Sequence, residues 1–96
     1  MSAYIVLDVV VRDPVIYERY KQLAGPTVSA YGGSYLVRGG AAVALEGSWT
    51  PSRLVILEFP SEQRARAWWT SPEYGPAKAI RRSCADTEML LVEGLR

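Results

Sequence analysis

The stretch Ala3-Tyr4-Ile5-Val6-Leu7-Asp8-Val9-Val10-Val11 decides the fold of this chain. It is almost continuously apolar and rich in valine, a residue type that favours β-strands. Because side chains alternate between the two faces of a strand, both faces of this one are apolar, and Asp8 is the exception. A strand that is apolar on both faces is normally covered on both. We therefore expect a helix on one face and a second layer, such as the sheet of a partner, on the other.

The segment after this strand carries clear helix signals. Asp13-Pro14 combines a capping residue with a first-turn proline, and Tyr31-Gly32-Gly33 supplies a glycine for the helix end. Pro26 lacks a backbone donor, so we expect a kink or a break near Ala24. The helical period predicts one stripe that faces the core: Ile16, Tyr20, Leu23, Ala24, Thr27 and Tyr31.

Extended segments and short helices fill the rest of the chain. Gly39-Gly40 predicts a tight hairpin between strands over 34–38 and 42–46. Four further elements are indicated: strands over 53–59 and 88–93, and helices that begin at Ser61 and at Ser71-Pro72-Glu73. In these short helices, the adjacent Trp68 and Trp69 point about 100° apart, so we expect one in the core and one at a helix or subunit contact.

The order of these elements predicts one α+β domain over residues 1–96. Helical connections that return the chain to one sheet are typical of a ferredoxin-like split βαβ sandwich, an antiparallel sheet with helices on one face. This layout leaves the other sheet face bare, although the strands are apolar on both sides. A bare apolar face is an association surface, so we expect a homodimer packed sheet to sheet. A monomer with a half-covered sheet is the alternative.

Composition excludes several classes of function. Eleven Lys and Arg residues nearly balance ten Asp and Glu residues, which gives no electrostatic case for nucleic acid. The chain has no His and a single Cys, which rules out a disulfide within the chain, a Cys-rich zinc site and a Ser-His or Cys-His nucleophile. We therefore expect no metal and no cofactor.

The start of the chain lacks a cationic region and no apolar run is long enough to span a membrane. These features favour a cytoplasmic protein, in which Cys84 is a reduced, buried thiol.

An ordered set of residues spans almost the whole chain: Asp13-Pro14, Tyr17, Tyr20, Pro26-Thr27, Tyr31-Gly32-Gly33, Arg38-Gly39-Gly40, Glu46-Gly47, Arg53, Glu58-Phe59-Pro60, Trp68, Ser71-Pro72-Glu73-Tyr74 and Arg81. This set resembles the bacterial domain-of-unknown-function family thirteen-thirty. The resemblance implies a dimeric α/β barrel, in which two ferredoxin-like subunits pack their sheets together. It implies no activity, because the family has none assigned. The wider superfamily includes antibiotic-biosynthesis-type monooxygenases, muconolactone isomerases, haem-degrading enzymes and regulatory ligand-binding modules.

Six polar residues interrupt otherwise apolar elements and form the candidate ligand site: Asp8, Tyr20, Tyr31, Arg38, Arg53 and Glu58. A carboxylate on a covered face needs a partner or a raised pKa, and the arginines are available partners. One hypothesis is a cleft between helix and sheet. There an arginine holds a ligand carboxylate or enolate, a carboxylate moves a proton, and the tyrosines donate hydrogen bonds. The alternative is that these charges form ion pairs across strands and at the dimer edge.

Two classes of function stay open at this point. The first is a homodimer that binds a small organic molecule in this cleft, as a metal-free oxygenase or isomerase. The second is a non-catalytic module that binds a ligand or a protein, which the lack of a recognisable catalytic constellation favours.

Overall fold

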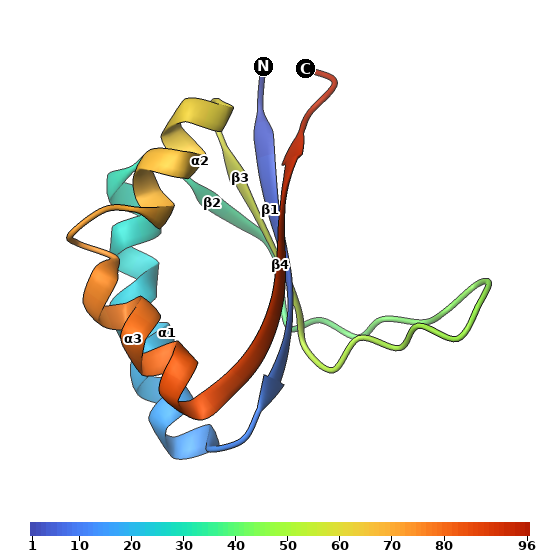
Figure 1. Ribbon diagram of the computed structural model, residues 1–96. Helices are drawn as coiled ribbons and strands as arrows, with labels where there is room; N and C mark the ends of the chain where they lie inside the picture. Colours follow the sequence, from blue (N-terminus) through green and yellow to red (C-terminus); the bar gives the residue numbers. More distant parts are fainter.

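The computed structural model describes residues 1–96 as a four-stranded sheet with three helices against one face (Figure 1). The elements are, in chain order, β1 (Ala3–Val11), α1 (Pro14–Ala30), β2 (Ser34–Arg38), β3 (Leu54–Phe59), α2 (Glu62–Trp69), α3 (Gly75–Cys84) and β4 (Ala85–Glu93). The strand order is β2-β3-β1-β4 and every pairing is antiparallel. The predicted ferredoxin-like α+β fold is confirmed.

β1 is the central organising strand, because it pairs with β3 on one side and with β4 on the other. Ile5, for example, lies opposite Leu57 of β3 and Leu91 of β4. The side chains that face the helices are buried from Ala3 to Val9, whereas those on the other face are half-buried or exposed. The apolar character of both faces therefore has two different consequences, a core on the helix side and an open surface on the other.

The core is built around three large aromatic side chains. The ring of Trp68 lies 4.0 Å from that of Tyr74 and 5.5 Å from that of Phe59, measured between centroids. All three are almost completely buried, and each such side chain contributes roughly 1.5–3 kcal/mol through burial alone. Trp69 is 36% exposed. The two tryptophans thus differ in burial as their spacing predicts.

α1 begins and ends as expected but does not break. The Asp13 carboxylate accepts hydrogen bonds from the backbone nitrogens of Val15 and Ile16, at 3.1 and 3.2 Å. The end is made by Gly32, which has a φ of +81°. Of the kink or break expected near Ala24, the break is wrong, because the helix continues through Pro26, and the kink stays a prediction. Pro26 lies on the exposed side of the helix, so the carbonyl that loses its partner can be hydrated.

The buried stripe of α1 is also offset from the predicted one. Tyr17, Tyr20, Ala24 and Val28 face the core, whereas Ile16 and Leu23 are exposed. The reason is that tyrosine rings fill the space over the sheet, so the helix is turned toward Tyr17 rather than toward the aliphatic residue before it.

The hairpin predicted at Gly39-Gly40 is wrong. β2 pairs with β3, and the backbone nitrogen of Gly39 donates to the carbonyl of Leu54 at 2.8 Å. The residues from 40 to 50 are exposed and unpaired. They form a long loop that projects on the side of the sheet opposite the helices (Figure 1). The segment over 42–46 is exposed throughout, whereas β3 offers three buried side chains.

Two boundaries in the second half also differ from expectation. Ser71 caps a turn rather than a helix, since its hydroxyl accepts from the backbone nitrogen of Tyr74 at 3.0 Å, and α3 begins later at Gly75. β4 begins at Ala85, earlier than expected, because it pairs with β1 along its whole length as far as Val11. None of the helices is long and apolar enough to cross a membrane, and the cytoplasmic location stays a prediction.

Gly33 tests how tightly the helix layer meets the sheet. A Cβ at this position would lie 2.6 Å from the ring of Phe59 and 2.8 Å from a methyl group of Val28. We expect Gly33→Ala to lower the free energy of unfolding by about 1–3 kcal/mol through overpacking. Urea denaturation measures the change. Gly40→Ala is the matched control, because only a methyl group of Val37, 3.9 Å away, lies near its Cβ. Equal stabilities of the two variants would contradict this packing.

Candidate functional site

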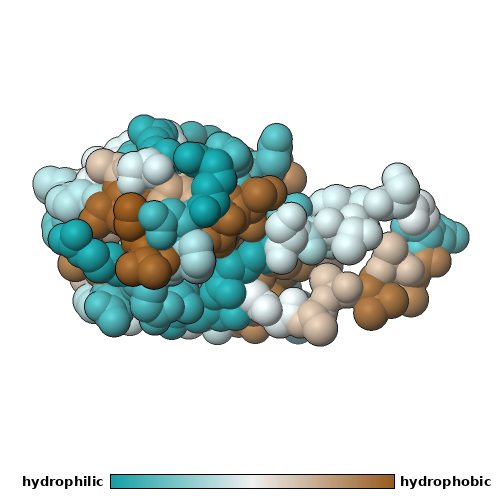
Figure 2. Space-filling view, turned by 90° about the horizontal axis from the view of Figure 1, so that it is seen from below, coloured by the Kyte–Doolittle hydropathy of each residue, from teal (hydrophilic) through white to brown (hydrophobic).

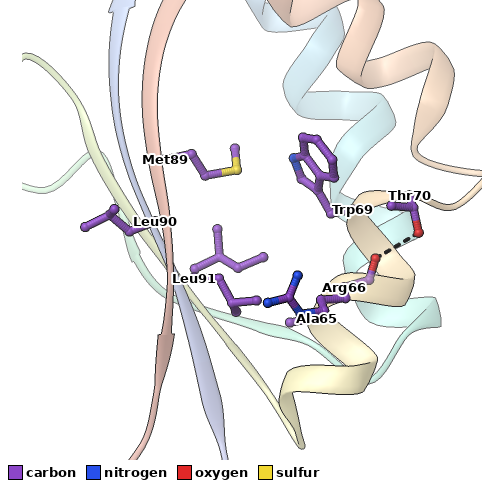
Figure 3. A pocket seen from close by; sticks show the side chains of 8 residues that line it. Ala65, Arg66, Trp69, Thr70, Met89, Leu90 and Leu91 are labelled. Atoms are coloured by element: carbon purple, nitrogen blue, oxygen red, sulfur yellow. Dashed lines mark hydrogen bonds between the residues drawn. The ribbon is translucent and has the colours of Figure 1, made fainter.

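A groove opens between β4 and the helices α2 and α3 (Figure 3). Its first part has a volume of about 360 Å³, within the usual range for ligand sites. A second, more open part of about 560 Å³ shares Trp69 and Met89 with the first. We call the whole the β4 groove. It is lined by Ile5, Ala65, Arg66, Trp69, Thr70, Arg81, Arg82, Ala85, Asp86, Thr87, Glu88, Met89, Leu90 and Leu91.

The two parts of the β4 groove differ in chemistry. The first is mainly apolar, and Figure 3 shows Met89 and Leu91 of β4 facing Trp69 and Ala65 of α2 across it. The second is mainly polar, and its polar lining residues are Arg81, Arg82, Asp86, Thr87 and Glu88. A molecule with an apolar body and a polar head matches this division.

Arg81 is the most unusual residue of the groove, because it is a buried cation without a carboxylate partner. Its side chain is only 5% exposed. Its Nε donates to the hydroxyl of Tyr74 at 3.4 Å, and that hydroxyl lies 3.0 Å from the hydroxyl of Tyr20. The ion pairs of the chain all involve other residues. A buried charge normally has a charged partner, so Arg81 is suited to bind an external anion.

The protonation states of this cluster are set by burial and by the hydroxyls. Burial acts to lower the pKa of Arg81, but the Tyr74 hydroxyl, followed by that of Tyr20, offsets this and holds the pKa above its ordinary value. Burial, together with Tyr74, raises the pKa of Tyr20 far above its usual range. At neutral pH Arg81 is therefore charged and Tyr20 is a neutral phenol.

Two further features make this end of the groove suitable for an anion. The hydroxyl of Thr87 is buried and has no hydrogen-bond partner. The ammonium of Lys78 lies 3.8 Å from the centre of the Trp69 ring, and burial, then Arg82 and Arg81, lowers its pKa. Burial is the main cause of this lower pKa, and the positive charges of Arg82 and Arg81, which line the groove, add to it. A bound anion would offset those charges.

Three of the six predicted ligand residues lie together, but away from the β4 groove. Tyr20, Arg38 and Arg53 meet between α1 and the strands β2 and β3, where the enclosed cavity is only about 20 Å³. This is close to the space that one water molecule needs. Arg38 stacks on the ring of Tyr35 at 4.2 Å and Arg53 on that of Tyr17 at 5.5 Å. The rings of Tyr17 and Tyr35 fill most of the space where the sequence hypothesis places a ligand.

The other three predicted residues are separate from that cluster. Asp8 lies on the open face of the sheet and accepts hydrogen bonds from Trp49 Nε1 at 3.3 Å and from the backbone nitrogen of Ser52 at 2.9 Å. Glu58, on the same face, accepts from the Tyr4 hydroxyl at 3.3 Å. The Tyr31 hydroxyl donates to Glu73 at 3.0 Å. The ligand-binding role of all six residues stays a prediction.

From the sequence, Arg81 is one of the arginines available as a partner for the carboxylates, but neither it nor Thr87 is among the six candidate ligand residues. A signal for Arg81 was present, since it falls on the buried stripe of α3 between Ala77 and Cys84. An arginine on an apolar stripe is unusual. Thr87 carries no comparable signal.

Cys84 is buried as predicted, and burial raises the pKa of its thiol. No group of three or more His, Cys, Asp or Glu residues is placed to hold a metal ion.

Removal of the hydrogen bond between Tyr74 and Arg81 should lower the free energy of unfolding. Tyr74→Phe takes away the acceptor of the buried Arg81 Nε and a partner of Tyr20. We expect the free energy of unfolding to fall by about 1–3 kcal/mol. Tyr31→Phe removes an exposed tyrosine hydroxyl instead and should change it by less than about 0.5 kcal/mol. Urea denaturation compares the two, and equal effects would contradict the network.

Known proteins resemble this chain in sequence profile and in fold. The profile of the family described as Domain of unknown function (DUF1330) matches residues 2–95. A comparison with curated proteins finds no match. A protein of unknown function from Rhodopseudomonas palustris has a similar structure, with 21% identity, 99% of this chain and 83% of that chain covered, and a TM-score of 0.76.

Two other solved structures share the fold at lower identity. SnoaB, described as a cofactor-independent oxygenase from Streptomyces nogalater, is 14% identical, with 99% of this chain and 94% of that chain covered and a TM-score of 0.72. A dimeric ferredoxin-like protein of unknown function from Thermobifida fusca is 16% identical, with 98% and 92% covered and a TM-score of 0.60. These likenesses extend over nearly the whole chain, and with the profile match they lead to one conclusion: the chain belongs to the family described as Domain of unknown function (DUF1330).

Proposed function

We propose that this protein binds a small organic anion with a planar apolar body in the β4 groove, and that it does so as a homodimer. One observation carries the proposal. Arg81 is a buried, charged side chain without an ion-pair partner, and it lines the polar part of the groove, which joins the apolar part at Trp69 and Met89. A carboxylate, enolate or phenolate would supply the missing charge.

The rest of the ligand matches the apolar part of the groove. Trp69 offers an aromatic surface on one side, and Met89 and Leu91 offer flexible apolar contacts on the other (Figure 3). The Thr87 hydroxyl is free to donate to the anionic head. Placed in this way, the head lies at the polar end and the body lies between α2 and β4.

The chemistry that this geometry supports is stabilisation of an anionic form of the ligand. A guanidinium in a poorly hydrated site favours an enolate or phenolate over its neutral acid. Such electron-rich anions are intermediates in isomerisation, and they are also the forms that react with oxygen when no metal is used. SnoaB, which shares the fold, is described as a cofactor-independent oxygenase. This likeness in fold supports the proposal that the site is catalytic in the same way.

A specific observation favours the alternative of a binding module without chemistry. Asp86 and Glu88 line the polar part of the groove, but they pair with Val10 and Asp8 of β1 and so belong to the strand face that points away from the helices. Neither carboxylate forms an ion pair with Arg81, so neither is placed beside it as a general base. A catalytic role needs the substrate to arrive as an anion, or a hydroxyl such as that of Thr87 to relay the proton.

The homodimer is proposed on the open face of the sheet. Leu36 and Leu90 are 52% and 65% exposed there, and Val10 and Val92 are also exposed. The loop over 39–53 projects on this same side (Figure 1), and hydrophobic surface is visible near the end of the projecting arm (Figure 2). Val43 and Leu45 of this loop are exposed. An apolar face with a projecting apolar arm fits a second copy of the chain. The Thermobifida fusca protein of the same fold is described as dimeric.

Binding of 2-naphthoate tests the role of Arg81. We expect this probe to bind the wild-type protein, and Arg81→Gln to weaken binding by roughly tenfold or more, because a charge-assisted hydrogen bond is lost. Arg64→Gln, an exposed change on α2 outside the groove, should have an effect of less than about twofold. Isothermal titration calorimetry measures the affinities. Circular dichroism checks the fold of each variant.

Two further measurements complete this test. Leu91→Phe narrows the apolar end and should weaken naphthoate binding even if Arg81→Gln fails to fold. The neutral amide 2-naphthamide should bind weakly, with the same affinity for the wild-type protein and for Arg81→Gln. Equal binding of the acid and the amide would refute the anion site. Oxygen uptake with a dihydroxynaphthalene that depends on Arg81 would support catalysis, whereas binding without turnover of any such compound would support the alternative.

The dimer is tested by a charge on the open sheet face. Ile56 is half-buried on β3 and faces away from the helices. We expect the wild-type protein to have the mass of a dimer in size-exclusion chromatography with light scattering, and Ile56→Glu to yield monomer, because a buried unpaired charge is costly. Val15→Glu, on the exposed side of α1, should leave the dimer intact. A wild-type monomer at micromolar concentration would refute this interface.

A further inference from the structure

A second group of cations lies at the other edge of the sheet, between α1 and the strands β2 and β3. Lys21, Arg38 and Arg53 line an open cleft of about 450 Å³ together with Glu18 and Gln22. No apolar residue lines this cleft. It shares no lining residue with the β4 groove and is a separate site.

The two guanidinium groups of this cleft are held in place by aromatic rings and backbone rather than by carboxylates. Arg38 stacks on Tyr35 at 4.2 Å and donates to the backbone carbonyl of Lys21 at 3.3 Å. Arg53 stacks on Tyr17, and its Nε is buried without a hydrogen-bond partner. Both groups are thus positioned in advance, while much of their hydrogen-bonding capacity stays free.

Gly39 leaves room for this arrangement. Its φ is +76°, and a Cβ at this position would collide with the guanidinium of Arg53. The glycine lies directly after β2, so the chain turns away where the arginine passes. The position of Arg53 therefore depends on the backbone at Gly39 as well as on the ring of Tyr17.

The charges in the cleft are not balanced. Glu18 is the one acidic side chain that lines it, and its carboxylate lies 2.8 Å from the ammonium of Lys21. The hydrogen bond from Lys21 holds the pKa of Glu18 below its ordinary value, so this carboxylate stays ionised. Neither Arg38 nor Arg53 forms an ion pair. Two guanidinium charges therefore face an open polar cleft without an anionic partner.

We propose that Lys21, Arg38 and Arg53 form a binding site for the phosphate group of a small molecule. A phosphate dianion matches two guanidinium charges, and its oxygens accept the parallel hydrogen bonds that arginine donates. The polar lining offers nothing to the apolar body that the β4 groove would select. The ligand is therefore a compact, polar phosphate compound, distinct from the planar anion proposed for the β4 groove.

Titration with inorganic phosphate tests this site on the whole chain. We expect phosphate to raise the midpoint of thermal unfolding in a saturable way, as ligand linkage requires. Arg38→Gln and Arg53→Gln should each weaken binding by roughly tenfold. Arg19→Gln, an exposed change on α1 that does not line the cleft, should have no such effect. Calorimetry gives the affinities directly.

A variant that strengthens binding separates this proposal from a loss of fold. Glu18→Gln removes the carboxylate that competes for Lys21, so phosphate should bind several times more tightly. Misfolding cannot produce that result. Unchanged affinity in Arg38→Gln, Arg53→Gln and Glu18→Gln would overturn the proposal. Phosphate binding that is lost in Arg81→Gln instead would also overturn it, because the anion would then lie in the β4 groove, and the proposed function would stand.

Discussion

The structure depends on one constraint: β1 is apolar on both faces, and the helices of one chain cover only one of them. The helix layer packs over the centre of the sheet and leaves the edge strand β4 less completely covered. The register shows the result, because Leu7 and Val9 are buried, whereas Met89 and Thr87, their partners on β4, are half-buried. The β4 groove thus forms because the helices do not fully cover the edge strand β4. The other face of the sheet is open because all three helices lie on one side.

The fold was predictable where its signals are local. A capping aspartate with a following proline defines the start of α1, and a left-handed glycine defines its end, whatever the rest of the chain does. The hairpin at Gly39-Gly40 was not predictable in this way. Its glycines permit a turn, but pairing is decided by which later segment has side chains to bury. β3 has Val55, Leu57 and Phe59, and it lies farther along the chain.

The candidate site was less predictable, since it depends on which face is covered. Alternation shows that Asp8 shares a face with Tyr4 and Val6, but it does not show that the helices pack on the opposite face. The carboxylates were for this reason grouped with arginines that lie across the sheet. Arg81 presents the reverse case. Its place on the stripe of α3 is visible in the sequence, whereas its lack of an ion-pair partner is a tertiary property.

A row of tyrosines explains how a small chain tolerates two unpaired arginines on its helix side. Arg53 lies 5.5 Å from the ring of Tyr17, and the rings of Tyr17 and Tyr20 are 5.3 Å apart. Tyr20 and Tyr74 are 6.4 Å apart, and Arg81 lies 6.0 Å from the ring of Tyr20. The electron-rich ring faces attract both guanidinium groups without neutralising their charge, which a carboxylate would do. The aromatic row therefore stabilises two separate cations in the fold and leaves each able to bind an anion.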